Sequence, residues 1–344
     1  MNDSLFEKLN NLWESEKPFV CFRLPNTDKA SVFFQKDTKL HWTKDLSCSG
    51  FLMAPFDLKQ PIPFIPDQFS EQFKILNTSP NLNSEVILDS KNKISFESLV
   101  IKAKEVIASG RLKKVVLSHS QDVKTKRDAV AIFQDLLSHY SLAMVYLWHH
   151  PLVGTWFGAT PEQFITTQEN LSQTMALAGT QTYLENEDPN WTTKEIEEQE
   201  LVAIQVEEDL KKIFPTNQIQ KNPTIDQRAG NLVHLCTCFQ FPKLDGNIVA
   251  LAQVLHPTPA VGGVPKEEAI RFIEENEAYE RSFYTGFLGP TNSSESQLYV
   301  NLRCARWTPE TTTLFVGAGI TLGSDPEKEW LETQRKAYTL AKVL

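Results

Sequence analysis

Short runs rich in β-branched and aromatic residues recur along the chain in groups, with only a few helical segments between them. They are predicted as strands over Lys114–Ser118, Ala143–Trp148, Thr155–Ala159, Thr174–Ala178, around Asn231–Phe239, Gln297–Arg303 and Thr313–Val316. This order lacks the strict alternation of strand and helix that builds a doubly wound parallel sheet, and the sequence carries neither a Rossmann fingerprint nor a P-loop. The pattern therefore predicts an α+β fold with largely antiparallel sheets.

Helical periodicity marks four segments. Apolar residues recur at helical spacing over 97–109, and Gly110 is placed to end that helix. A T-x-x-E capping box from Thr192 to Glu195 opens a long helix. Its apolar stripe is predicted at Ile196, Ala203, Val206, Leu210 and Ile213. Further helices are predicted over 266–281, where Pro265 suits the first turn, and from about Glu327 to Leu344.

The first 95 residues contain little that indicates chemistry. Short β-like runs at Pro18–Leu24 and Ser31–Gln35 stand among scattered Pro, Asn and Ser. We interpret residues 1–95 as a sheet-edge scaffold that belongs to the same fold as the functional region over residues 96–344.

Length and charge narrow the class of protein. With 344 residues the chain could form two domains, but large sheet folds often bury one continuous core at this length. Its 34 basic and 43 acidic residues give a formal net charge of −9, which disfavours nucleic acid as the main partner. An anionic substrate would therefore have to meet local positive charge or a metal ion.

The five cysteines form no disulfide framework, and the N-terminus lacks a basic start followed by an apolar core. We therefore expect a reduced, cytoplasmic protein. Cys236 and Cys238 are too closely spaced to hold zinc without a second pair, so neither metal nor redox use of them is expected. No apolar run approaches the roughly 20 residues of a membrane-spanning helix, so no membrane partner is expected.

Three residues in or beside strands could take part in chemistry. Lys114 opens an apolar strand, where it could be a solvated charge or a partly desolvated base. Glu162 follows Thr160-Pro161 at the end of another strand, where it could be a turn carboxylate or, in an apolar pocket, a general acid. His234 lies within an apolar run and is by default a core histidine. The residues alone leave these alternatives open.

Other residues could bind a metal ion or an anion. Glu198 and Glu332 lie on different predicted helices and could supply oxygen ligands to Mg²⁺. Glu332 and Lys336 are equally compatible with an exposed i,i+4 ion pair. Arg303 could hold a carboxylate with two hydrogen bonds, and the backbone of Gly317–Gly319 could approach an anion closely.

Taken together and in order, nine segments resemble the chorismate-utilising enzymes, the group of isochorismate, anthranilate, aminodeoxychorismate and salicylate synthases. The segments are KVVLS (114–118), GATPE (158–162), ALAGT (176–180), KEIEEQELV (194–202), LVHLCT (232–237), HPTPAVGG (256–263), RSFYTGFLG (281–289), VNLRCAR (300–306) and GAGITLGSDPEKEWLET (317–333). The resemblance runs from about Lys104 to the C-terminus. It implies one large domain of two stacked sheets with helices outside, and a chorismate-binding catalytic region over residues 96–344.

The resemblance also implies roles for individual residues. Lys114 matches the base that activates water at ring carbon C2, and Glu162 matches the acid that protonates the departing C4 hydroxyl. The Mg²⁺ ligand positions are matched by Glu198 and Glu332, and supporting acidic positions by Glu195 and Glu329. The positions that hold the substrate are matched by Gly179, Thr180, His234, Arg303, Ala318, Gly319 and Lys336.

Two features favour the isochorismate synthase branch. Ala178 stands where similar aminodeoxychorismate synthases carry a nucleophilic lysine, and HPTPAVGGVPK (256–266) is similar to the corresponding loop of isochorismate and salicylate synthases. We therefore expect a Mg²⁺-dependent isomerase that converts chorismate into isochorismate, with salicylate synthase as the alternative. Menaquinone biosynthesis is the expected pathway, and a catechol siderophore pathway is the alternative.

The same resemblance bears on partners and domain number. The sequence contains no glutaminase-like Cys/His/Glu region, and we expect a monomer without a glutaminase subunit. Departures from the family pattern at His119, Thr160, Gln199 and Cys238 concern substrate positioning rather than class. Because the implied base and metal ligands come from segments as distant as positions 114 and 332, one interleaved fold is predicted.

Overall fold

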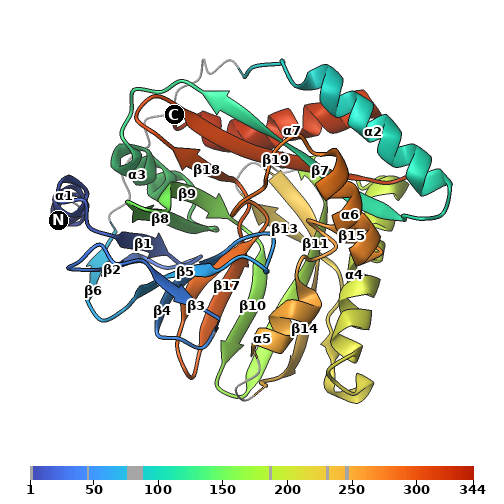
Figure 1. The fold of residues 1–344 in the computed structure, drawn as a ribbon. Coiled ribbons are helices and arrows are strands. Elements are labelled where there is room, and N and C mark those ends of the chain that lie inside the picture. The colour runs from blue at the N-terminus through green and yellow to red at the C-terminus, as the bar shows by residue number, and fades with distance from the viewer. Residues whose placement is uncertain (1–2, 45, 76–87, 186–187, 230–231, 245–247) are drawn as a thin grey trace.

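The computed structural model describes residues 3–44, 46–75, 88–185, 188–229, 232–244 and 248–344, and within them two antiparallel sheets dominate (Figure 1). The first has the strand order β15 (Gly263–Val264), β7 (Lys114–Val123), β19 (Thr312–Ile320), β18 (Cys304–Trp307), β9 (Gly154–Thr160), β8 (Met144–His150), β1 (Phe19–Arg23), β2 (Lys29–Phe34) and β6 (Ser70–Lys74). The second has the order β12 (Gln220–Lys221), β14 (Leu232–Pro242), β11 (Leu171–Thr182), β10 (Gln163–Gln168), β17 (Ser296–Val300), β16 (Phe287–Thr291), β4 (Gly50–Ala54), β5 (Ile62–Pro66) and β3 (His41–Thr43), and β13 (Ile225–Ala229) also pairs with β14. The predicted α+β fold with largely antiparallel sheets is confirmed.

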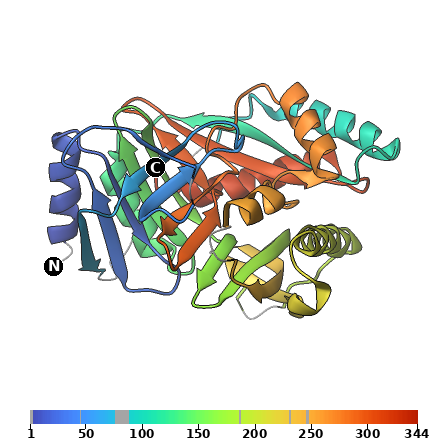
Figure 2. The same cartoon turned by 60° about the horizontal axis from the view of Figure 1, so that its bottom comes forward.

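Helices cover the outer faces of the sheets (Figures 1 and 2). They are α1 (Asp3–Glu14), α2 (Lys93–Ala108), α3 (Ala129–His139), α4 (Thr193–Lys211), α5 (Ile248–Leu255), α6 (Lys266–Asn276) and α7 (Pro326–Ala341), with a short 3₁₀ turn at Thr216–Gln218. In the first sheet, α2 and α6 pack on β7, α7 packs on β19, and α3 packs on β8 and β9. In the second, α4 packs on β11 and β14, with α5 beside it. No helix among the described residues combines the length and the apolar character needed to cross a membrane.

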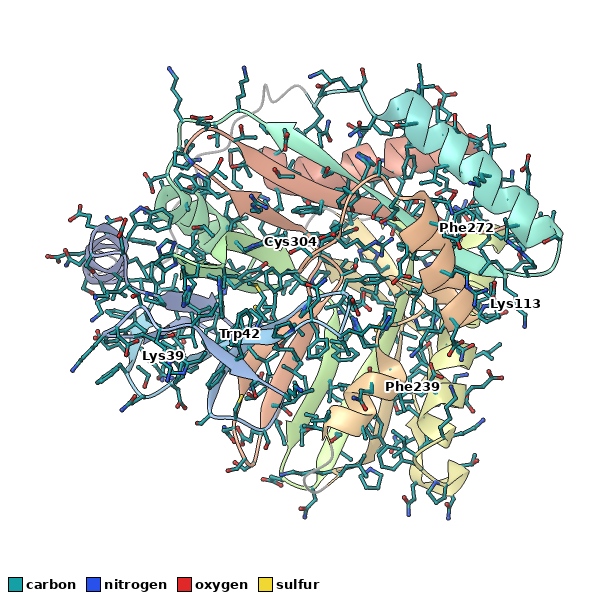
Figure 3. All side chains as sticks on the ribbon, viewed as in Figure 1. Lys39, Trp42, Lys113, Phe239, Phe272 and Cys304 are labelled. Atoms are coloured by element: carbon teal, nitrogen blue, oxygen red, sulfur yellow. The ribbon has the colours of Figure 1, made fainter. Side chains whose placement is uncertain are left out.

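The sheets face each other across an aromatic core. Phe51 of the second sheet has its ring centroid 5.0 Å from that of Phe22 and 6.2 Å from that of Trp148, both in the first sheet. Further apolar clusters fill the space under the helices, with Phe239 of β14 facing α4 and α5, and Phe272 of α6 facing the first sheet (Figure 3). Burial on both faces of each sheet therefore holds the layers together.

The N-terminal segment is built into both sheets. β1 pairs with β8 in the first sheet, and β4 pairs with β16 in the second. Strands from residues 19–74 thus lie beside strands that come much later in the chain. This is the arrangement expected of one interleaved fold.

The buried face of α4 differs from the predicted stripe. Ile196 is 42% exposed, whereas Gln199 is 3% exposed and its side-chain amide donates to Thr237 Oγ1 at 2.7 Å. A polar side chain is buried here because β14 supplies its hydrogen-bond partner. The remaining apolar part of the face is Val202, Ala203, Val206 and Leu210. The prediction was therefore wrong at Ile196 and is confirmed from Ala203 to Leu210.

The glycine-rich segment Gly317–Ile320 lies within a strand rather than after one. It forms the end of β19 and pairs with Val115–Ser118 of β7. A side chain at Gly317 would begin 2.6 Å from Leu117 O, so glycine permits the strands to lie this close. Similarly, β17 ends at Val300 and not at the predicted Arg303, because Arg303 has a left-handed φ of 46° that turns the chain toward β18.

A buried ion pair fixes the segment after α6. Glu277 and Arg281, whose side chains are each 2% exposed, are 2.6 Å apart. Arg281 also donates to the carbonyl oxygens of Val261 and Val116, and the Glu277 carboxylate accepts from Ser118. The pair ties this segment to β7 and to the loop before β15. For this reason α6 ends at Asn276, earlier than predicted, and the chain turns into the core.

Replacing Arg281 with alanine is expected to lower the free energy of unfolding by about 3–5 kcal/mol, because Glu277 would be left as an unpaired buried charge. Urea denaturation of the purified protein measures this change. As the control, Arg271→Ala breaks the exposed pair with Glu268 and should cost less than about 1 kcal/mol. Equal losses in the two variants would contradict the role of the buried pair.

Candidate active site

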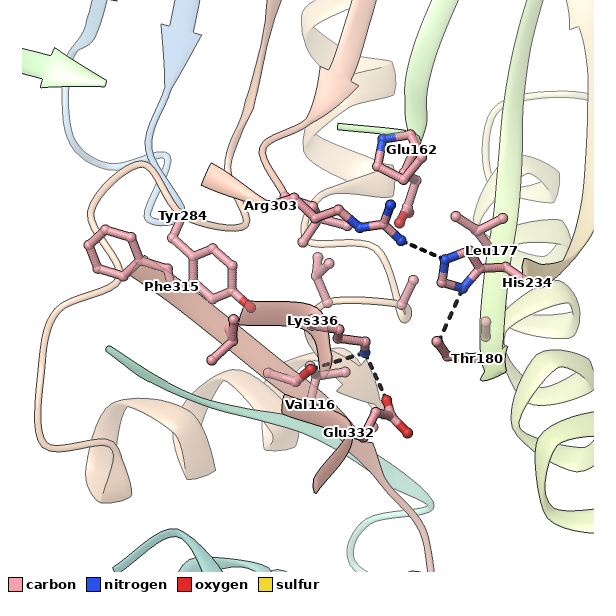
Figure 4. A pocket seen from close by; sticks show the side chains of 18 of the residues that line it. Val116, Glu162, Leu177, Thr180, His234, Tyr284, Arg303, Phe315, Glu332 and Lys336 are labelled. Atoms are coloured by element: carbon pink, nitrogen blue, oxygen red, sulfur yellow. Dashed lines mark hydrogen bonds and ion pairs between the residues drawn. The ribbon is translucent and has the colours of Figure 1, made fainter. Parts of the chain in front are cut away.

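A pocket of about 820 Å³, partly open to solvent, lies where β11 and β14 approach β19 and α7 (Figure 4). Residues 177–180 of β11 and His234 of β14 line one side, and β19 and α7 line the other. Glu162, from the connection between β9 and β10, and Arg303, from the connection between β17 and β18, complete the wall. Apolar side chains and a few polar and charged groups line it together, as they do in sites that bind small organic molecules.

Glu162 is a buried carboxyl group that faces this pocket. It is 2% exposed, and its backbone is held in place because Val300 N donates to its carbonyl oxygen at 3.0 Å. Burial raises the pKa of Glu162 to about 8, against the opposing effect of the charges on Lys114 and Lys336. Oε1 has no hydrogen-bond partner among the described residues. At neutral pH the group is therefore a protonated acid that can donate to a ligand.

Lys114 is the first residue of β7 and is 1% exposed. Its Nζ lies 3.1 Å from Oε1 of Glu198, which reaches the pocket from α4. Gly319 makes room for this pair, since a Cβ there would lie 2.1 Å from Glu198 Oε1 and 3.1 Å from Lys114 Cε. The sequence alternative of a solvated edge lysine is wrong, because the amine is buried beside the pocket wall.

His234 and Arg303 form a connected pair on the pocket wall (Figure 4). Arg303 Nη2 donates to His234 Nε2 at 2.8 Å, so Nε2 accepts and the ring proton lies on Nδ1. Nδ1 in turn donates to Gly179 O at 2.9 Å and lies 3.1 Å from Thr180 Oγ1. Gly179 has φ +71°, which aims its carbonyl at the ring. Burial and the charge of Arg303 lower the pKa of His234 well below its usual value, so the imidazole is neutral.

Two further lysine–glutamate pairs involve α7, one within the helix and one that joins it to α4. Lys336 Nζ donates to Glu332 Oε1 at 2.8 Å and to Gly317 O at 3.0 Å. Lys194 Nζ is 2.6 Å from Oε1 of Glu329, whose side chain is 2% exposed. Burial opposes a charge on Lys194, but the nearby glutamates outweigh it and raise its pKa. Three glutamates of the site, Glu198, Glu332 and Glu329, are thus each held in an ion pair with a lysine.

The two predicted Mg²⁺ ligands lie at the pocket. Glu198 and Glu332 both line the pocket, and their carboxylate oxygens are the donors that Mg²⁺ prefers, completed by substrate oxygens and water. No group of three or more His, Cys, Asp and Glu side chains within the described residues is arranged to hold a metal by itself. Two carboxylates facing a ligand pocket therefore fit Mg²⁺ that is bound together with a substrate.

Two other predicted site residues, Glu195 and Ala318, are not among the residues that line the pocket. Oε2 of Glu195 accepts from Thr192 N at 2.8 Å and from Gln181 at 2.8 Å, so the predicted capping box is confirmed and this carboxylate is engaged at the start of α4. Ala318 lies between Gly317 and Gly319, but its side chain packs in the core with α2 and α7. Only its backbone is available to a ligand.

Sequence reasoning missed an aromatic wall of the pocket. Tyr284 and Phe315 stack with ring centroids 5.7 Å apart and an interplanar angle of 20°, and both line the pocket. Phe315 could have been found from the sequence. Side chains alternate along a strand, so Phe315 lies on the same face as Gly317 and Gly319. Tyr284 lies in an irregular segment, where no periodicity indicates its direction.

A protonated buried carboxyl group, a buried amine and an arginine around one pocket define an enzyme site for a small anionic ligand, with carboxylates suited to a hard metal ion. The family model described as chorismate binding enzyme matches residues 63–344, and the chain belongs to this family. The family predicted from the sequence motifs is confirmed.

Individual relatives agree with this assignment. The chain is 30% identical over 342 residues to the isochorismate synthase EntC of Escherichia coli (strain K12), covering 93% of the chain and 86% of EntC. Its fold is similar to that of a putative 2,3-dihydroxybenzoate-specific isochorismate synthase, DhbC from Bacillus anthracis, with TM-score 0.82, 24% identity and coverage of 98% and 99% of the two chains. It is also similar to MenF, the menaquinone-specific isochorismate synthase from E. coli, with TM-score 0.80, 22% identity and coverage of 95% and 88%. The two structural likenesses establish the fold.

Gly319→Ala is expected to weaken chorismate binding strongly and to lower the free energy of unfolding by up to about 3–5 kcal/mol, because it would separate the buried Lys114 amine from Glu198. The new Cβ would displace the flexible ends of Glu198 and Lys114 and would not meet rigid backbone. Titration calorimetry with chorismate and Mg²⁺, together with urea denaturation, measures the two effects. Gly323→Ala is the control, because its nearest neighbour would be 4.0 Å away. Unchanged chorismate affinity in Gly319→Ala would contradict the placement of the ligand against β19.

Proposed function

We propose that the protein is an isochorismate synthase, an isomerase that converts chorismate into isochorismate. Water adds at ring carbon C2, the ring double bonds shift, and the C4 hydroxyl leaves with a proton as water while the enolpyruvyl group stays attached. The observation that carries the proposal is the placement of Glu162 and Lys114. They come from different segments, are buried beside one pocket and lie within electrostatic reach of each other.

In this proposal the Lys114 amine acts in its neutral form, in which it can take the proton from the attacking water. Its amine is the first side chain of β7, and Glu198 Oε1 holds Nζ at 3.1 Å beside the pocket that Glu198 itself lines. Burial on every side restricts the amine to one position, which favours a proton transfer with fixed geometry. The neighbouring Lys113 is exposed and has no such constraint.

Glu162 is proposed to donate the proton to the departing C4 hydroxyl. Its carboxyl group is protonated at neutral pH because its pKa is about 8, and its Oε1 has no partner among the described residues. A buried acid without a competing acceptor retains its proton for the ligand. Lys114 and Glu162 thus form a base and an acid with opposite tasks.

The anionic groups of chorismate are proposed to meet Arg303, Lys336 and the Gly317–Gly319 backbone, which line the pocket. His234 and Gly179 hold the guanidinium of Arg303 in place, because the neutral imidazole accepts from it. We propose that Glu198 and Glu332 hold Mg²⁺, which supplies positive charge to a substrate carboxylate when it is bound. Glu329 is proposed to support this site through its pair with Lys194.

Pathway and assembly follow as further proposals. We propose a role in menaquinone biosynthesis, with a catechol siderophore pathway as the alternative, because the proteins of similar fold include a menaquinone-specific and a putative 2,3-dihydroxybenzoate-specific isochorismate synthase. Loss of menaquinone on deletion of the gene tests the first. We also propose a monomer. The proposed reaction adds water and uses no ammonia, so it needs no glutaminase subunit.

Incubating the purified protein with chorismate and Mg²⁺ is expected to give isochorismate without pyruvate, and chelation of Mg²⁺ should stop turnover. Chromatography identifies the product, and lactate dehydrogenase with NADH detects pyruvate. Lys114→Ala should lower kcat by about 10²–10⁴-fold, whereas the control Lys113→Ala should retain it. Salicylate with pyruvate would instead identify a salicylate synthase, and an ammonium-dependent fluorescent product would identify an amine-transferring enzyme.

The kcat of the wild type is expected to fall as the pH rises through about 8, because Glu162 must be protonated to act and its pKa is about 8. Glu162→Gln should lower kcat by about 10²–10⁴-fold and remove this alkaline limb. The control, Glu169→Gln, changes an exposed turn carboxylate and should keep both the rate and the profile. An alkaline limb that persists in Glu162→Gln would assign the titration to another group.

A further inference from the structure

Two cysteines lie directly behind one wall of the pocket. Cys236 and Cys238 share a face of β14 with His234, because side chains alternate along a strand. Across the ladder to β11, Cys236 is paired with Leu177 and Cys238 with Met175, and these four side chains form a small cluster. Leu177 itself lines the pocket. A change at the two thiols would therefore reach the site through adjacent side chains.

The two thiols are close together and differ in environment. Their Sγ atoms are 3.9 Å apart. Cys236 is fully buried, whereas Cys238 is partly exposed. The hydrogen bond between them lowers the pKa of Cys238 and raises that of Cys236. An accessible thiol that ionises readily, beside a buried one that stays protonated, is the arrangement of an attacking and a resolving cysteine.

The other cysteines lack this combination. Cys21 and Cys304 are buried, and burial raises the pKa of each thiol. Cys48 is partly exposed, and its Sγ lies 3.9 Å from Thr291 Oγ1 rather than from a second thiol. Cys48 is therefore a control for a partly exposed cysteine at another place in the fold.

We propose that Cys236 and Cys238 are a modification site, at which hydrogen peroxide converts the thiol pair into a reversible disulfide that lowers the activity of the enzyme. The Cys238 thiolate attacks the peroxide, the O–O bond breaks, and sulfur is oxidised to a sulfenic acid as hydroxide leaves and is protonated to water. The Cys236 thiol then attacks the sulfenic sulfur, the S–S bond forms and a second water leaves. The peroxide is reduced and two thiols are oxidised, so atoms and electrons balance.

The disulfide must distort β14. The sulfurs have to close from 3.9 Å to about 2.05 Å, and both belong to one extended strand. β14 is paired on both sides, with β11 and with β13, so the strain is passed to its neighbours. His234 is two residues away on the same face, and the Glu162 carboxyl group is near enough to interact electrostatically with Cys236. A strained disulfide is also easily reduced, which makes the change reversible.

The test uses the full-length protein, treated with hydrogen peroxide and then with dithiothreitol. Mass spectrometry of the tryptic peptide 229–243, which contains both cysteines, should show the loss of two hydrogens after peroxide and their return after reduction. Chorismate turnover should fall about tenfold or more after peroxide and recover with dithiothreitol, because small displacements of positioned groups cost large factors in rate. Cys238→Ser and Cys238→Ala should keep full activity under the same treatment.

The mass measurement does not depend on the reaction, so it stands even if the proposed function fails. Absence of the peptide-internal disulfide, or oxidation of Cys238 only to a sulfenic or sulfinic acid, would overturn the proposal. Inactivation by peroxide that persists in both Cys238 variants would overturn the link to activity, and so would protection by Cys48→Ser.

Discussion

The antiparallel pairing of β7 with β19 is the constraint on which the active site depends. The two strands are joined along their length, from the pair Val123 with Thr312 to the pair Val115 with Ile320. This ladder places Lys114 beside Gly319, and it brings α7, with its glutamates and lysine, next to the strand pair that contains Lys114. A slip of one residue would turn Gly317 and Gly319 away from the pocket and direct core side chains into it. The glycines and the alternating core residues of β19 therefore specify the register as well as the site.

Charge is arranged in pairs throughout this site. Lys114 faces Glu198, Lys336 faces Glu332, and Lys194 faces Glu329. Each pair avoids the cost of a lone buried charge. If a dianionic ligand entered together with a divalent cation, no net charge would be added, and Glu198 and Glu332 could face the cation while Lys336 faces the anion. The formal net charge of −9 then poses no barrier, because the exchange is local.

Much of the fold and site could be predicted because short motifs carry both. The strand at Lys114 and the turn at Glu162 lie where the sequence places them, and Glu198 and Glu332 line the pocket as expected. What failed depended on contacts between distant segments. Gln199 is buried only because Thr237 of another element accepts its hydrogen bond, and Gly317–Ile320 is a strand only because β7 pairs with it. Likewise, the two-residue spacing of Cys236 and Cys238 brings their sulfurs to 3.9 Å only because this segment is a strand.

The position of the first strands has a consequence for biosynthesis. β1 lies against β8, but β4 lies against β16, which begins at Phe287. The second sheet therefore cannot close until more than four-fifths of the chain has left the ribosome, and the first sheet must also wait for β19. Until then the early strands expose unpaired edges with apolar faces, a condition in which chains associate with one another. Pairings this distant also slow folding, because a long loop must close before each contact forms.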